Sequence, residues 1–127
     1  MPASKPDATA LLDAAIDYLE RELLPTLAGY HRFQCRVTIN VLAQVRRELA
    51  LAPGQADAER ARLIALLGHP GERDALSREL AARIRAGELA LDDPALLDHL
   101  RQSLVEALRI NNPRWLGEPE PGEPERG

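Results

Sequence analysis

The sequence is poor in cysteine and in aromatic residues, and it has no long hydrophobic run. Its 127 residues include one cysteine, Cys35, which excludes an internal disulfide and is typical of a reducing compartment. No uncharged run reaches the roughly 20 residues of a membrane span, and residues 1–9 lack the apolar stretch of a secretion signal. We therefore expect a cytoplasmic protein without a membrane contact.

The four aromatic residues are Tyr18, Tyr30, Phe33 and Trp115. Because aromatics are scarce, the core must consist of Leu, Ile, Val and Ala, which suits packing of helix on helix. The formal net charge is −4, and residues 117–127 carry four glutamates against one arginine. The rest of the chain is therefore nearly neutral, which argues against nucleic acid, since that partner requires a basic face.

Motifs of catalysis are also missing. The sequence has no GxxxxGK[ST] loop, no GxGxxG after a strand and no GxSxG, so an autonomous kinase or hydrolase is not expected. His31, His69 and His99 lie in three different segments without partners at ligand spacing, and we expect His99 in solvent. We predict no catalytic residue, no metal and no cofactor, and we interpret Cys35 as a small buried hydrophobe.

Apolar residues recur at helical spacing from Asp7 to Asn112, and Gly, Asn and Pro residues separate five stretches. The predicted helices span 7–24, 30–51, 56–67, 72–86 and 93–111. Asp93 followed by Pro94 is the clearest start signal, a cap residue and then a proline at the first helical position. Short loops favour antiparallel neighbours, so we predict an all-α, up-and-down bundle over residues 1–116. Residues 117–127, rich in Glu and Pro, are predicted to be a disordered acidic tail.

The helix predicted at 30–51 is apolar over more than half of its circumference, which predicts contacts on two sides and a central position. On this interpretation, Val41→Asp would unfold the domain. One polar line remains on the helix, formed by Arg36, Asn40, Gln44 and Arg47. Two guanidinium groups and two amides can face water or pair within the chain, or they can meet carboxylates or phosphates of a partner or ligand.

Several segments together resemble a bacterial family of small helical proteins of unknown function. They are Leu24-Pro25 with Leu27 and Gly29, Phe33-x-x-Arg36-Val37-x-x-Asn40-x-Leu42 with Arg47-Glu48-Leu49, Arg83-x-Arg85-x-Gly87-Glu88, and Asn112-Pro113-Arg114-Trp115-Leu116. Relatives in that family are encoded beside, or fused to, aminoglycoside-phosphotransferase-like kinases and acyl-CoA dehydrogenases. The resemblance implies an accessory subunit of a kinase that phosphorylates hydroxyacyl-CoA substrates, and it supplies no catalytic residues.

The sequence thus favours a non-catalytic partner of a phosphotransferase-like kinase, either alone or as a homo-oligomer. One alternative is a small module that binds acyl-CoA or another anionic ligand through Arg36 and Arg47, and another is an enzyme with an unrecognised site. A pocket lined by Arg36, Asn40 and Arg47 would favour a ligand, whereas an apolar patch rimmed by them would favour a protein partner.

Overall fold

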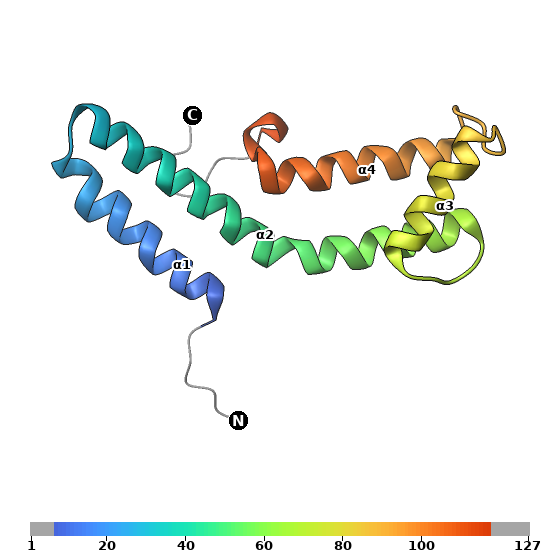
Figure 1. Cartoon of the computed structure of the whole chain (residues 1–127), viewed down its shortest axis with the longest axis horizontal. Helices are drawn as coiled ribbons and strands as arrows, with labels where there is room; N and C mark the ends of the chain where they lie inside the picture. Colours follow the sequence, from blue (N-terminus) through green and yellow to red (C-terminus); the bar gives the residue numbers. More distant parts are fainter. Residues whose placement is uncertain (1–6, 118–127) are drawn as a thin grey trace, which may run out of the picture. The chain divides into compact units, whose positions relative to one another are not determined.

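A computed structural model describes residues 7–117, and within this range the chain is all helical, without a β-strand. It has four α-helices, two short 3-10 helices and one π-helical segment (Figure 1). The elements in chain order are α1 (Ala8–Asp17), η1 (Tyr18–Leu23), η2 (Leu24–Thr26), α2 (Gly29–Leu67), α3 (Arg73–Arg85), α4 (Pro94–Asn111) and η3 (Pro113–Leu116). The all-α prediction is confirmed, while the predicted tail at 118–127 lies outside the described residues.

The prediction of five helices is wrong by one, because the segments 30–51 and 56–67 belong to the single helix α2. Pro53 and Gly54 lie inside α2 rather than ending it. Proline removes one N–H donor and crowds the carbonyl four residues earlier, which kinks or breaks most helices. In this chain the helix nevertheless continues through Pro53, from Gly29 to Leu67.

Helix ends follow the local sequence closely. The Asp7 carboxylate accepts a hydrogen bond from the Ala10 N–H at 2.9 Å, and that of Asp93 accepts one from the Leu96 N–H at 3.0 Å. Gly87 follows α3 with φ of 73°, a left-handed conformation that favours glycine. These caps and the glycine fix the start of α1, the end of α3 and the start of α4 within one or two residues of the predicted positions, whereas α1 ends at Asp17, where the π-helical segment η1 begins.

Two compact units divide the described chain between Ala52 and Pro53, so that each contains one part of α2. In the N-terminal unit, α1 and the two short helices after it pack against the first part of α2. Leu24, Cys35 and Ile39 are buried there, which confirms the interpretation of Cys35. Ile16, Leu19, Leu23 and Leu27 pack around these three side chains.

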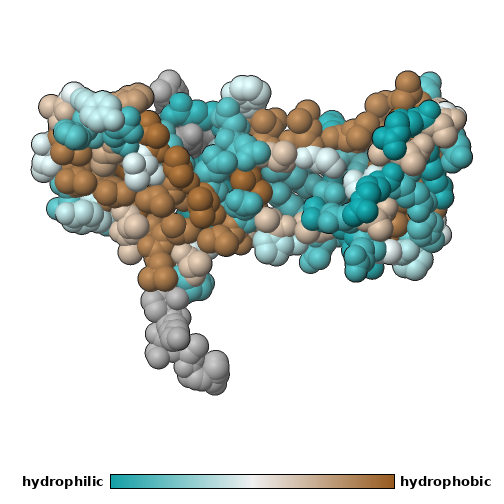
Figure 2. Space-filling model, viewed as in Figure 1, coloured by the Kyte–Doolittle hydropathy of each residue, from teal (hydrophilic) through white to brown (hydrophobic). Residues whose placement is uncertain are grey.

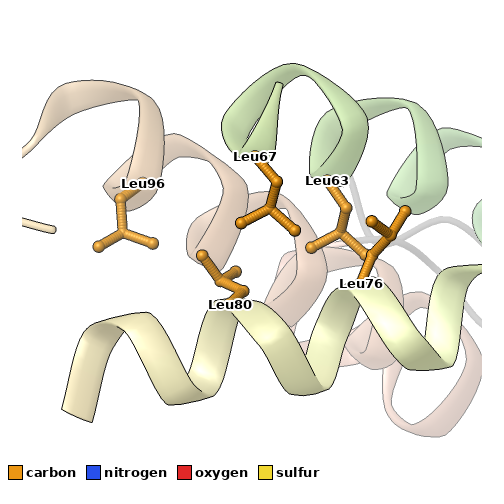
Figure 3. Close-up of a cluster of buried hydrophobic side chains, with 5 residues drawn as sticks. All are labelled: Leu63, Leu67, Leu76, Leu80 and Leu96. Carbon is orange, nitrogen blue, oxygen red and sulfur yellow. The ribbon is translucent and has the colours of Figure 1, made fainter. Parts of the chain in front are cut away.

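In the C-terminal unit, the second part of α2, α3 and the start of α4 enclose a cluster made only of leucines (Figure 3). Its members are Leu63, Leu67, Leu76, Leu80 and Leu96. They are at most 7% exposed, and Leu63 is fully buried. Each leucine occupies a position that helical periodicity predicts to be inward.

The prediction that the helix at 30–51 is covered on two sides is wrong. Val41 is 54% exposed, so the first part of α2 is covered on one side only, not on two. On α4, Leu97, Leu100 and Leu104 are exposed, and Trp115 is 76% exposed. Figure 2 shows hydrophobic side chains at the surface in the regions of α1, α2 and α4. Each unit therefore presents apolar surface that its own helices leave open.

Among residues 7–117, none of the helices combines the length and the apolar character that crossing a lipid bilayer requires.

Candidate partner interface

The most extended apolar surface of the N-terminal unit is one face of α2. Six side chains between 39% and 69% exposed form it, and we call it the open face: Tyr30, Phe33, Val37, Val41, Val45 and Leu49. They follow one another at steps of three or four residues, so they share one side of the helix. Cys35, Ile39 and Ala43 lie on the opposite side and are buried. The helix thus has two apolar faces, of which one is covered.

The four predicted site residues lie along one edge of the open face. Arg36 and Asn40 are exposed, as is Gln44, whereas Arg47 is half-buried. The Nη1 atom of Arg36 lies 3.5 Å from Oε2 of Glu20, and the Arg36 side chain remains 49% exposed. Gln44 and Arg47 each take part in an interaction within the chain. The polar line is therefore both a rim of the open face and partly tied to the fold.

The covered face of α2 shows how this helix binds a neighbour. Ile16 and Leu19 supply the apolar contact to the cluster around Ile39. At the sides, the Asp13 carboxylate accepts hydrogen bonds from Arg46, one of them at 3.2 Å from Nη2. Glu20 approaches Arg36 in the same way from η1. Within this unit, α2 thus packs against an apolar stripe of α1 and η1 that is accompanied by carboxylates.

The C-terminal unit contains a polar cluster that sequence reasoning missed, centred on Arg62 of α2. Its Nη2 donates to Oε1 of Glu106 at 2.7 Å and to Oγ of Ser103 at 3.2 Å. Its Nε donates to Nδ1 of His99 at 3.0 Å. Since His99, Ser103 and Glu106 follow at i, i+4 and i+7 beside the buried Leu96, their spacing was the signal that could have revealed a shared inward face.

The expectation that His99 is solvated is wrong, because the residue is only 6% exposed. Burial, and secondarily the charge of Arg62, lowers the pKa of His99. A neutral ring is also what the geometry requires, since Nδ1 accepts a hydrogen bond from Arg62. The guanidinium group of Arg62 thus makes its hydrogen bonds within its own unit. We interpret the cluster as a structural link between α2 and α4.

His69 differs, because it lies at the surface after α2 with an acceptor at each ring nitrogen. Nδ1 is 2.9 Å from the Pro70 carbonyl oxygen and Nε2 is 2.8 Å from Oε1 of Glu79. The Glu79 contact, followed by that of Pro70, raises the pKa of His69. Glu79 also pairs with Arg83 at 2.6 Å. The arrangement ties the loop after α2 to α3 and leaves no ring nitrogen for other chemistry.

Two concavities lie on the surface of the C-terminal unit. One, of about 210 Å³, is lined by residues of α2 and α4 that include Arg62, Asp98 and His99. The other, of about 230 Å³, follows α4 and includes Arg101 and Arg109. Neither contains a residue of the polar line. Within the described part of the chain, no three His, Cys, Asp or Glu side chains gather in a way that could hold a metal ion.

Fold and surface together define an all-helical protein whose longest helix presents an uncovered apolar face with arginines at its edge. Comparison with family models adds one match, the Domain of unknown function (DUF6285), over residues 25–115. This range is more than half of the chain, and the chain belongs to the DUF6285 family. Searches of the curated proteins and of the solved structures found no significant match.

Proposed function

We propose that this chain is a non-catalytic accessory subunit of an aminoglycoside-phosphotransferase-like kinase that acts on hydroxyacyl-CoA. The observation that carries the proposal is the open face of α2 with its polar edge. An apolar surface of this size that is rimmed by polar residues is typical of a protein interaction site. The kinase itself, and its substrate, come from the resemblance of the sequence described above.

The residues at the edge suit a protein partner. Arginine is enriched at interfaces because its planar fork holds a carboxylate while its stem packs against apolar atoms. Arg36 is half exposed, and Arg47 lies eleven residues later, on the same side of α2. Aromatic side chains, here Tyr30 and Phe33, contribute disproportionately to binding when a partner covers them.

The alternative of an anionic-ligand module has less support. Phosphates or a CoA moiety need a concave site with converging donors. The polar line runs along a helix surface, and the two concavities of the C-terminal unit are lined by other residues. We therefore keep the protein partner as the single proposed function.

The test is a calorimetric titration in which the full chain is titrated into the aminoglycoside-phosphotransferase-like kinase encoded beside it, called the neighbouring kinase below. We expect Arg36→Ala with Arg47→Ala to weaken binding by about 2 kcal/mol or more, roughly 30-fold, if both are central contacts. The matched control is Arg78→Ala with Arg85→Ala, which removes two exposed arginines from α3. Circular dichroism checks that both double variants fold.

Two results would contradict the proposal. Absence of binding between the kinase and the wild-type chain would refute the accessory role. Equal loss of affinity in both double variants would show a general effect of net charge rather than an interface at α2. A kinase assay with a hydroxyacyl-CoA, with and without the chain, then measures whether binding changes phosphoryl transfer; the chain alone should transfer no phosphoryl group.

A further inference from the structure

The geometry of the open face favours a crossing helix. From Phe33 to Leu49 the exposed side chains follow at steps of four residues, which is a row inclined to the helix axis. A partner helix that packs its own four-residue row beside this one crosses α2 at about 50°. A coiled-coil seam would instead alternate steps of three and four residues. The row is therefore typical of helix packing between globular domains.

The charges of this part of α2 are strongly one-sided. Residues 29–52 contain four arginines, at 32, 36, 46 and 47, and a single carboxylate, that of Glu48. In the N-terminal unit, Arg46 and Arg36 already meet carboxylates of the neighbouring helices α1 and η1. Arg36 and Arg47 also lie on the edge of the open face. A segment that covers this face meets positive charge along one side.

The area of the open face is close to what a specific contact needs. With exposed fractions of 39–69%, the six side chains present roughly 450 Å², if a full aromatic side chain has about 200 Å² and a full Val or Leu side chain about 100–130 Å². Covering them from a partner buries about twice that area in total. Specific interfaces begin at about 1,000 Å². A crossing helix, together with the surface of the partner beside it, thus makes a contact near this lower limit.

A second copy of this chain fits the face less well. Placed antiparallel on itself, the open face brings the two edges with Arg36 and Arg47 to the same side. Placed parallel, each basic edge meets an edge that Gln34 and Thr38 occupy, without a carboxylate. Only Glu48, at one end, would offer a negative charge.

We propose that the open face of α2 binds an amphipathic helix of the partner protein whose apolar row is flanked on one side by carboxylates. This helix would repeat on the open face what α1 and η1 do on the covered face, where Ile16 and Leu19 pack inward and Asp13 and Glu20 reach arginines. The inference rests on the proposed function for the identity of the partner. It adds which face is used and the chemistry of the segment that occupies it.

The experiment places the photo-crosslinking amino acid p-benzoylphenylalanine at Val41 of the full chain, in complex with the neighbouring kinase. Mass spectrometry should identify one kinase peptide with apolar residues at steps of three or four and at least two Asp or Glu along one edge. Val41→Asp should weaken kinase binding at least tenfold. The matched control, Leu104→Asp, changes a comparably exposed apolar side chain of α4 and should leave binding unchanged.

Salt supplies an independent measurement. Because the contact pairs arginines with carboxylates near the surface, affinity should fall between about 0.05 M and 0.5 M salt. Arg36→Gln, which keeps hydrogen-bonding capacity without the charge, should flatten this dependence.

The failures are distinguishable. If the wild-type chain does not bind the kinase, the proposed function is refuted, and this inference, which rests on it, is refuted as well. If the kinase binds but Val41 crosslinks to a second copy, to its own chain or to a peptide without carboxylates, only the inference is overturned. Wild-type affinity of Val41→Asp has the same meaning, since the kinase then binds elsewhere.

Discussion

Replacement of Leu63 by alanine tests the core of the C-terminal unit most directly. Leu63 is fully buried, and the leucines around it are at most 7% exposed. The substitution removes three carbon atoms, which costs about 2.4 kcal/mol at about 0.8 kcal/mol per buried methylene. The substitution leaves a cavity that is lined by leucines of three helices, α2, α3 and α4. Because these helices pack against one another, the cavity should collapse only in part. We expect a total loss of about 3–4 kcal/mol in the free energy of unfolding.

The measurement is urea denaturation of the full chain, followed by circular dichroism at 222 nm. A lower midpoint with an unchanged slope shows lost stability rather than a changed unfolded state. Leu104→Ala is the control, since Leu104 is 62% exposed and should lose less than about 0.5 kcal/mol. Equal effects of the two substitutions would refute the placement of the leucine cluster.

Three further predictions concern the caps, the buried histidine and the open face. Asp93→Ala removes the acceptor for the Leu96 N–H and should cost about 1 kcal/mol in urea denaturation; no change would show that the cap is dispensable. Because burial and Arg62 lower the pKa of His99, the unfolded chain binds a proton below about pH 6.5 that the native state does not. His99 should therefore lower stability from pH 7 to pH 5, whereas His69, whose pKa is raised, contributes in the opposite direction. Relative to the wild type, His99→Gln should lose less stability over that range; equal slopes would contradict this. Val41→Asp should change stability by less than about 1 kcal/mol, and cooperative unfolding at much lower urea would place Val41 inside.

The helix ends and the leucine cluster could be predicted from the sequence because they depend on local chemistry. Asp93 caps α4 with its own carboxylate, and Gly87 ends α3 by adopting a positive φ. Leu76 and Leu80 face inward because their spacing matches one side of a helix and few polar residues interrupt it. None of these features requires knowledge of a distant segment.

The continuity of α2 and the position of His99 could not be predicted in the same way. Proline and glycine at 53 and 54 favour a break locally, yet both lie inside α2. On α4, apolar residues occupy a wide arc, and the sequence does not say which part of it the neighbouring helices cover. The inward part includes His99 because Arg62 satisfies its ring nitrogen. The position of His99 thus depends on a tertiary contact.

The first part of α2 shows what an apolar pattern measures. The apolar pattern predicts two apolar faces on this helix, and this is correct, since Ile39 is buried on one side and Val41 is exposed on the other. The error was to infer that the chain itself covers both. Apolar periodicity reports that a face avoids water in the working state of a protein, and it does not name the molecule that excludes the water. A face at which Tyr30 and Phe33 stand exposed beside a basic edge is therefore better explained by a partner than by the fold. It follows that substitutions on the open face should affect association more than folding, whereas those at Ile39 should do the reverse.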